Sequence, residues 1–190
     1  MKKWLVLFAL LVSNQVFAHP NHDTSIFSAL LHPLTGWDHL LTMLIIGVMA
    51  YQFPIKKGVI LPAIFVGTFT LSAILSSGLG VGEEQLHRLN QMILVALMVL
   101  PVVHVALTKL SFPMVSLFMG LIGVVHGVTH GIELDASSSS VLAGLILGTM
   151  LIHVIGFLAA MSVSKKHEWV LKALTICSGI FAATVFAQSI

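Results

Sequence analysis

The chain has 190 residues, of which 57% are hydrophobic and only 8% are charged, and its formal net charge is +2. Soluble domains carry about 25% charged residues, so this composition excludes an ordinary soluble protein. It also excludes nucleic-acid binding, because the sequence has no basic stripe that could contact phosphates. The first prediction is therefore an integral membrane protein.

The N-terminus has the three parts of a secretory signal peptide. Lys2 and Lys3 form a charged start, residues 4–12 are apolar, and Ala18 ends a small-x-Ala cleavage site. We predict a signal peptide over residues 1–18 and a mature membrane domain over residues 19–190. The alternative is an uncleaved anchor helix, and in both cases the next segment begins on the exported side.

A first polar motif precedes the first long apolar segment. It reads His-Pro-Leu-Thr-Gly-Trp-Asp-His at positions 32–39. Pro33 and Gly36 predict a turn, which would let His32 fold back towards Asp38. Asp38 and His39 would then lie at the external mouth of a helix. A carboxylate there could also cap backbone amides, which is the structural alternative for Asp38.

Six apolar segments follow, each near the ~17–25 residues that a helix needs to cross a bilayer. They cover residues 37–53, 59–76, 89–107, 112–132, 141–163 and 169–188. The predicted fold is an all-α integral membrane protein, a six-transmembrane-helix bundle after an N-terminal signal peptide.

Loop charges predict how this bundle is oriented. The loops after the first, third and fifth segments are basic, with Lys56, Lys57, Lys109, Lys165 and Lys166, whereas those after the second and fourth contain Glu83, Glu84, Arg88, Glu133 and Asp135. Lys and Arg concentrate on the cytoplasmic side of membrane proteins. The mature N- and C-termini are therefore predicted to be periplasmic, in a bacterial inner membrane.

Small residues predict where helices approach closely. Glycines recur every four residues in the fourth segment, at Gly123, Gly127 and Gly131, and again in the fifth, at Gly144 and Gly148. This spacing is typical of membrane helices whose backbones come into contact.

A second polar motif lies in the outer half of the fourth segment, where it reads His-Gly-Val-Thr-His-Gly-Ile-Glu at positions 126–133. Side chains at i, i+4 and i+7 share one face of a helix, so His126, His130 and Glu133 can converge. Ionisable groups inside a membrane are rare and mark a site or a pathway. His153 lies about 18 Å along the fifth segment, near the midplane. It is predicted either to extend these groups into a column or to be a core histidine bonded to a neighbour.

Imidazoles and carboxylates without thiolates suit Ni²⁺, Co²⁺, Zn²⁺ or Cu²⁺ better than Cu⁺. No prosthetic group is predicted; the metal would be the transported ligand. The predicted metal ligands are His32, Asp38, His39, His126, His130, Glu133 and His153.

The two motifs and the order of six apolar segments after a signal peptide resemble the HupE/UreJ family. This resemblance covers essentially the whole mature chain. It implies a bacterial permease for nickel, and in some members cobalt, that is associated with hydrogenase and urease maturation. By motif it assigns His32, Asp38 and His39 to the first family signature, and His126, His130 and Glu133 to the second.

The predicted function is thus a non-enzymatic permease whose partners are a divalent metal ion and the lipid bilayer. A homo-oligomer and a nickel-delivery partner stay open. One alternative is an intramembrane metalloenzyme, although no Glu follows His126 directly as in His-Glu-x-x-His. Others are a haem protein with His126 and His153 as axial ligands, and an accessory or sensor protein that binds metal without moving it.

Overall fold

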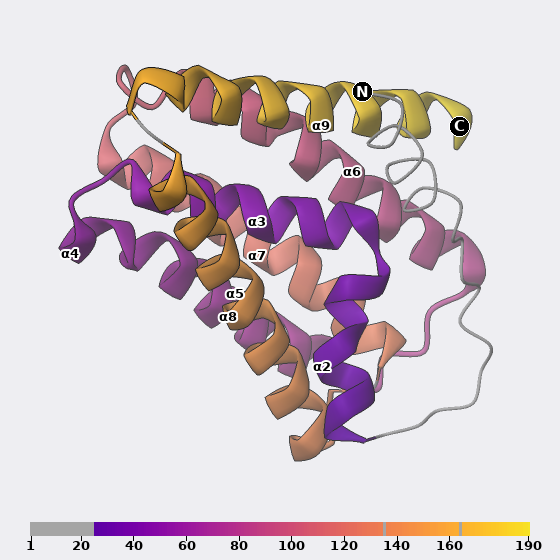
Figure 1. Ribbon diagram of the computed structural model, residues 1–190. Helices are drawn as coiled ribbons and strands as arrows, with labels where there is room; N and C mark the ends of the chain where they lie inside the picture. The colour runs from indigo at the N-terminus through magenta and orange to yellow at the C-terminus, as the bar shows by residue number, and fades with distance from the viewer. Residues whose placement is uncertain (1–24, 135, 164) are drawn as a thin grey trace, which may run out of the picture.

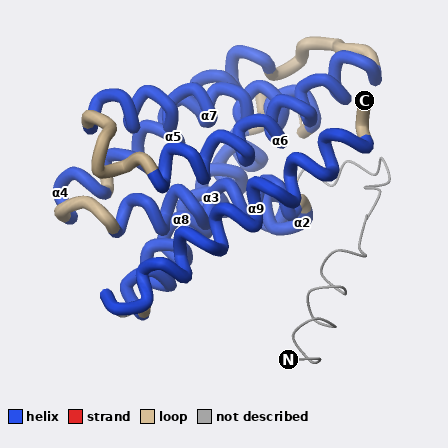
Figure 2. Tube along the Cα trace, turned by 90° about the horizontal axis from the view of Figure 1, so that it is seen from above, coloured by secondary structure: helices blue, strands red, loops and turns tan. Residues whose placement is uncertain are grey.

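The structure, a computed structural model, describes residues 25–134, 136–163 and 165–190. Every regular element in these ranges is helical, and short loops join the helices (Figure 2). The elements are α2 (Ile26–Thr35), α3 (Trp37–Tyr51), α4 (Ile55–Gly58), α5 (Ile60–Ser76), α6 (Glu83–Val105), α7 (Phe112–Glu133), α8 (Ser139–Ser162), η1 (Lys165–His167) and α9 (Glu168–Gln188). The predicted signal peptide, residues 1–18, lies outside the described residues.

The helical membrane fold is confirmed. Five helical stretches are long and apolar enough to cross a bilayer, and α2 with α3 makes up to a sixth. Helix α6 begins at Glu83 rather than at residue 89. Hydropathy missed this first part because it is polar, but Glu83 and Glu84 suit the positive end of a helix dipole.

The first polar motif does not form the predicted turn. Pro33 lies inside α2, and the chain breaks only at Gly36, where α2 and α3 meet at an angle of 85°. The Thr35 hydroxyl donates to the His32 carbonyl over 2.7 Å and so satisfies one of the last carbonyls of α2. A Cβ on Gly36 would lie 2.8 Å from His39 Nδ1. A larger residue at the break would therefore displace the His39 ring and the Asp38 carboxylate.

Glycine contacts join α5 to α7, as the spacing in α7 predicted. Cβ atoms at Gly123, Gly127 and Gly131 would collide with the α5 carbonyl oxygens of Phe65, Phe69 and Ala73. The Ser72 and Ser76 hydroxyls donate to the α7 carbonyls of Val124 and Val128 over 3.2 and 3.1 Å. Close van der Waals packing of helix backbones and interhelical hydrogen bonds are the interactions that hold helices together in lipid.

A second group of helices is joined in the same way. Gly144 and Gly148 of α8 lie against the α2 backbone, and Gly156 of α8 lies against the α3 backbone. Gly47 of α3 in turn contacts the backbone carbonyl of His153. Helices α2, α3 and α8 therefore form one packed group and α5 with α7 another. Helices α6 and α9 lie side by side along one side of the bundle (Figure 1).

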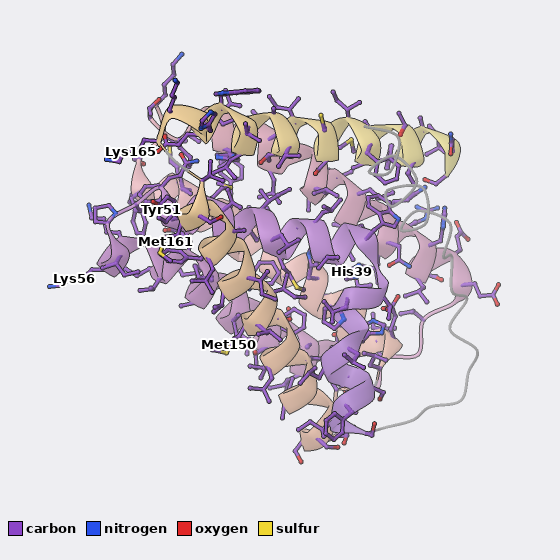
Figure 3. All side chains as sticks on the ribbon, in the orientation of Figure 1. His39, Tyr51, Lys56, Met150, Met161 and Lys165 are labelled. Carbon is purple, nitrogen blue, oxygen red and sulfur yellow. The ribbon has the colours of Figure 1, made fainter. Side chains whose placement is uncertain are left out.

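The two ends of the bundle differ in charge. Helix α4 and the α6–α7 and α8–α9 connections lie at the same end, on the left of Figure 1. They contain all five loop lysines that define the predicted cytoplasmic side, and Figure 3 labels Lys56 and Lys165 there. The last turn of α7 and the α2–α3 break lie towards the other end.

Gly127→Ala is expected to destabilise the protein by about 1–3 kcal/mol, because the added methyl overpacks the α5–α7 contact. Gly67→Ala is the matched control, since a Cβ there would meet nothing within 4 Å. Thermal unfolding in detergent measures both variants. Equal melting temperatures would show that close approach at Gly127 does not stabilise the bundle.

Candidate metal site

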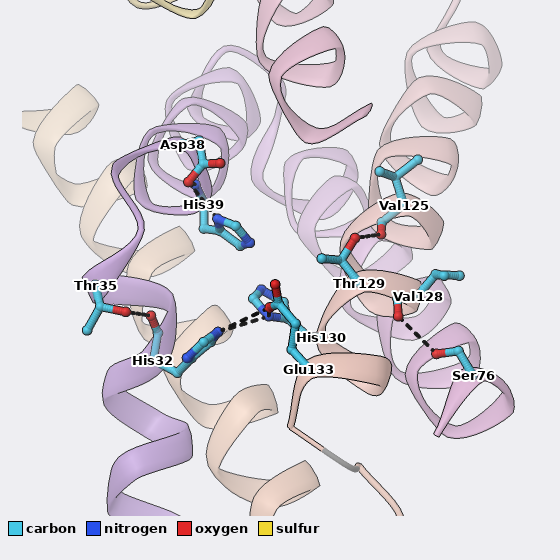
Figure 4. Close-up of polar contacts among 10 residues, drawn as sticks. All are labelled: His32, Thr35, Asp38, His39, Ser76, Val125, Val128, Thr129, His130 and Glu133. Carbon is cyan, nitrogen blue, oxygen red and sulfur yellow. Dashed lines mark hydrogen bonds and ion pairs between the residues drawn. The ribbon is translucent and has the colours of Figure 1, made fainter. Parts of the chain in front are cut away.

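Three helix ends position the polar side chains of the site. His32 lies in the last turn of α2, and Asp38 and His39 lie in the first turn of α3, directly after the Gly36 break. His130 and Glu133 lie in the last turn of α7. The 85° bend turns His32 towards α7 (Figure 4). His32 thus faces the second motif, and not Asp38 as the predicted turn implied.

His32, His130 and Glu133 form a compact group of possible ligands. His32 Nε2 lies 3.1 Å from His130 Nδ1 and 3.7 Å from Glu133 Oε2. His130 Nδ1 lies 3.4 Å from the same carboxylate oxygen. One ligand atom from each residue lies within 4.8 Å of the others. Imidazole and carboxylate ligands at about 2 Å from a transition metal are themselves separated by about 3 Å. The group therefore has nearly the dimensions of a coordination site.

Asp38 bonds to the neighbouring imidazole. Its Oδ1 accepts the His39 Nδ1–H over 2.7 Å and the His39 backbone N–H over 2.9 Å. A carboxylate in this position fixes the ring orientation and tautomer of a metal-binding histidine. Asp38, predicted as a ligand, thus has the geometry of a residue that positions His39.

His39 and His126 extend the group into the bundle. The His39 ring centroid lies 4.4 Å from that of His130 and 5.4 Å from that of His126. His126 and His130 are fully buried, and His39 is 8% exposed. Figure 3 shows His39 within the bundle. The structure thus places four imidazole rings in a series of neighbours, in the order His32, His130, His39 and His126.

Several buried imidazoles bond through Nδ1 and have an Nε2 atom without a hydrogen-bond partner in the described ranges. His126 Nδ1–H donates to the Ile122 carbonyl over 2.9 Å, and His153 Nδ1–H donates to the Thr149 carbonyl over 2.8 Å. The buried Nε2 atoms of His39, His126, His130 and His153 have no hydrogen-bond partner among the described residues. A buried polar atom without a partner costs about 1–3 kcal/mol. Three of these atoms, those of His39, His126 and His130, belong to neighbouring rings, and a cation that accepts the lone pair of one of them would remove the penalty at that ring.

His153 is separated from the other histidines by an aromatic ring. Phe65, which is fully buried on α5, has its ring centroid 5.5 Å from that of His126 and 5.1 Å from that of His153. The predicted column therefore has an outer part of four neighbouring imidazoles and, beyond Phe65, His153. Phe69 lies one turn along α5, 5.8 Å from the His130 ring. Sequence reasoning missed both phenylalanines, because an apolar helix gives no signal of which aromatic ring contacts a site.

His104, in contrast, has both ring nitrogens bonded. Its Nδ1–H donates to the Thr175 hydroxyl over 2.9 Å, and its Nε2 accepts from the Gln52 amide over 2.5 Å. The Thr175 hydroxyl donates in turn to the Leu171 carbonyl over 2.8 Å. This chain of bonds connects α3, α6 and α9. His104 is thus a satisfied structural histidine and has no free nitrogen for a metal.

Comparisons with known proteins agree with the motifs. A family model described as HupE / UreJ protein matches residues 7–185. Protein HupE of Rhizobium leguminosarum bv. viciae is 28% identical over 166 residues, which cover 85% of this chain and 85% of that protein. No solved structure matches this chain.

Proposed function

The chain belongs to the HupE/UreJ family, and from this premise we propose that it is a permease that moves Ni²⁺ or Co²⁺ from the periplasm to the cytoplasm. The ion would supply hydrogenase or urease maturation. In this proposal the protein is not an enzyme, it holds no prosthetic group, and the metal is its cargo. The two polar motifs bind the ion as it enters.

The observation that carries the proposal is the set of buried imidazole nitrogens that have no hydrogen-bond partner in the part of the chain that the structure describes. Buried Nε2 atoms of His39, His126 and His130 belong to neighbouring rings, and the Glu133 carboxylate lies 3.4 Å from the other ring nitrogen of His130, Nδ1. Neutral imidazoles with one carboxylate and no thiolate favour divalent ions such as Ni²⁺ and Co²⁺. The proposed ligands are His32, His39, His126, His130 and Glu133. Asp38 would orient the His39 ring, and His153 would be a later binding position along the path of the ion.

The two motifs lie in different helix groups, which supports movement of the ion rather than permanent storage. His32 and His39 belong to the α2–α3–α8 group, whereas His126, His130 and Glu133 belong to α7. An ion between two separately packed groups can be released when they shift. Conduction requires binding that is favourable enough for entry and weak enough for exit.

The proposed orientation follows the loop lysines. If the basic end of the bundle is cytoplasmic, the His32–His130–Glu133 group faces the periplasm of a bacterial inner membrane. Entry from the exported side would then reach His32 and Glu133 first, since these are the partly exposed members, with side chains 25% and 21% exposed. The fully buried His126 would follow.

Flux into proteoliposomes tests the proposal. Vesicles that contain a metal-sensitive dye are expected to take up external Ni²⁺ or Co²⁺ when they contain the wild-type protein. Metal binding without flux would instead identify an accessory or sensor protein. Metal-dependent hydrolysis of a peptide or lipid would identify an enzyme.

Glu133→Gln is expected to lower uptake at least about tenfold, because the variant loses the negative charge beside His32 and His130. Glu168→Gln is the matched control, since Glu168 is exposed at the start of α9. Initial rates of Ni²⁺ entry, normalised to inserted protein, measure the effect. Equal rates in both variants would remove Glu133 from the proposed site.

A further inference from the structure

An apolar groove lies between the two helix groups, away from the polar motifs. Its volume is about 550 Å³. Val59, Ala63 and Gly67 line one wall, and Met150, Val154 and Phe157 of α8 line the other. His153 also borders the groove, so the groove touches the inner end of the proposed metal path.

The groove opens towards the surface that faces lipid. Val59, Met150 and Val154 are each about half exposed, at 50%, 49% and 52%. A Cβ on Gly67 would meet nothing within 4 Å, although the glycines of α7 contact α5 directly. The described part of the chain therefore leaves this space between α5 and α8 unfilled, and in a bilayer its neighbours are acyl chains.

Positive charge marks one end of the groove. Ile55 and Val59, which both line it, flank the exposed Lys56 and Lys57. Lys57 Nζ lies 5.9 Å from the Phe112 ring centroid at the same end of the bundle. The sequence has no acidic residue between Asp38 and Glu83, so neither lysine has an anionic partner within its own helix or the adjoining segments.

We propose that this groove binds an anionic phospholipid, with one acyl chain between α5 and α8 and the phosphate at Lys56 and Lys57. The apolar walls match the chain, and the two ammonium groups match the headgroup. Basic pockets at the ends of transmembrane helices are known to recognise anionic headgroups in this way. The bound chain spans the space between the two helix groups and braces them beside His153. The proposal is independent of the transport function, because it requires only the membrane bundle.

Native mass spectrometry of the purified protein tests this site. The protein is delipidated and then titrated with phosphatidylglycerol or with phosphatidylcholine of the same acyl chains. Wild-type protein is expected to prefer the anionic lipid by about thirtyfold, which corresponds to about 1 kcal/mol for each of two lysines. The double variant Lys56→Gln/Lys57→Gln is expected to bind both lipids equally.

Groove filling separates the acyl-chain contact from the headgroup contact. Gly67→Trp places an indole in the groove and is expected to abolish binding of both lipids, whereas Leu71→Trp, on exposed α5 surface outside the groove lining, should bind as the wild type does. The double variant Lys165→Gln/Lys166→Gln controls for loss of two charges at the same end of the bundle. Folding of each variant is checked by its thermal unfolding in detergent.

Three results would overturn the proposal. The first is equal binding of the two lipids by wild-type protein, and the second is wild-type lipid binding by Gly67→Trp. The third is a lipid-free wild-type dimer that Gly67→Trp converts to a monomer, because a second copy of the chain would then occupy the groove.

Discussion

Replacing Asp38 with alanine is expected to lower Ni²⁺ affinity and uptake by about 10–100-fold, the usual loss when a carboxylate that orients a metal-binding histidine is removed. Asp38 Oδ1 accepts both the ring and the backbone N–H of His39. Without it, the His39 ring can rotate and its Nε2 no longer points reproducibly towards the other imidazoles. The expected change is in affinity, so it is measured by isothermal titration of purified protein and by initial uptake rates.

X-ray absorption of nickel-loaded protein distinguishes the two possible roles of Asp38. If Asp38 positions His39, Asp38→Ala is expected to lower the average number of imidazole ligands. If Asp38 is itself a ligand, the variant loses an oxygen and keeps its imidazoles. Wild-type affinity in Asp38→Ala would contradict both roles. Glu168→Ala is the control, because its carboxylate is exposed on α9.

His126→Ala and His104→Ala are expected to have opposite effects, although both residues are fully buried histidines. His126 Nε2 has no partner among the described residues, whereas both nitrogens of His104 are bonded. His126→Ala should therefore reduce uptake to the background of empty vesicles, with little change in melting temperature. His104→Ala should retain uptake per folded molecule.

The same pair of variants predicts a difference in stability. His104→Ala breaks the hydrogen bonds to the exposed Gln52 amide and to the buried Thr175 hydroxyl, which keeps only its bond to the Leu171 carbonyl, and each lost bond costs about 0.5–1.5 kcal/mol. Its melting temperature should fall clearly below that of His126→Ala. Uptake that survives in His126→Ala, or is lost in a folded His104→Ala protein, would reverse the assignment of the two histidines.

Much of the fold could be predicted because its signals are local. Long apolar runs identified α3 and the helices from α5 to α9, and the glycine repeat in α7 identified a close helix contact that proved to be with α5. Helix α2 was missed because it has only ten residues and contains Pro33. A short helix next to a break has neither the length of a span nor a clear periodicity, so its residues were interpreted as a turn.

Only part of the candidate site could be predicted from such local signals in the sequence. The spacing of His126, His130 and Glu133 placed them on one helix face, which is a property of helix geometry alone. That His32 approaches His130, and not Asp38, depends on the angle of 85° between α2 and α3. The position of Phe65 between His126 and His153 depends on how α5, α7 and α8 are rotated about their axes.

The sequence by itself determined that this chain is a helical membrane protein of the HupE/UreJ family with two polar motifs near helix ends. Hydropathy and motif spacing depend on residues that are close together in the sequence, so they can be evaluated without knowledge of the fold. Only the tertiary structure decided which imidazole nitrogens are hydrogen-bonded and which lack a partner among residues 25–134, 136–163 and 165–190. That outcome depends on side chains from separate helices meeting at a few ångströms, and close glycine contacts between helices set those distances.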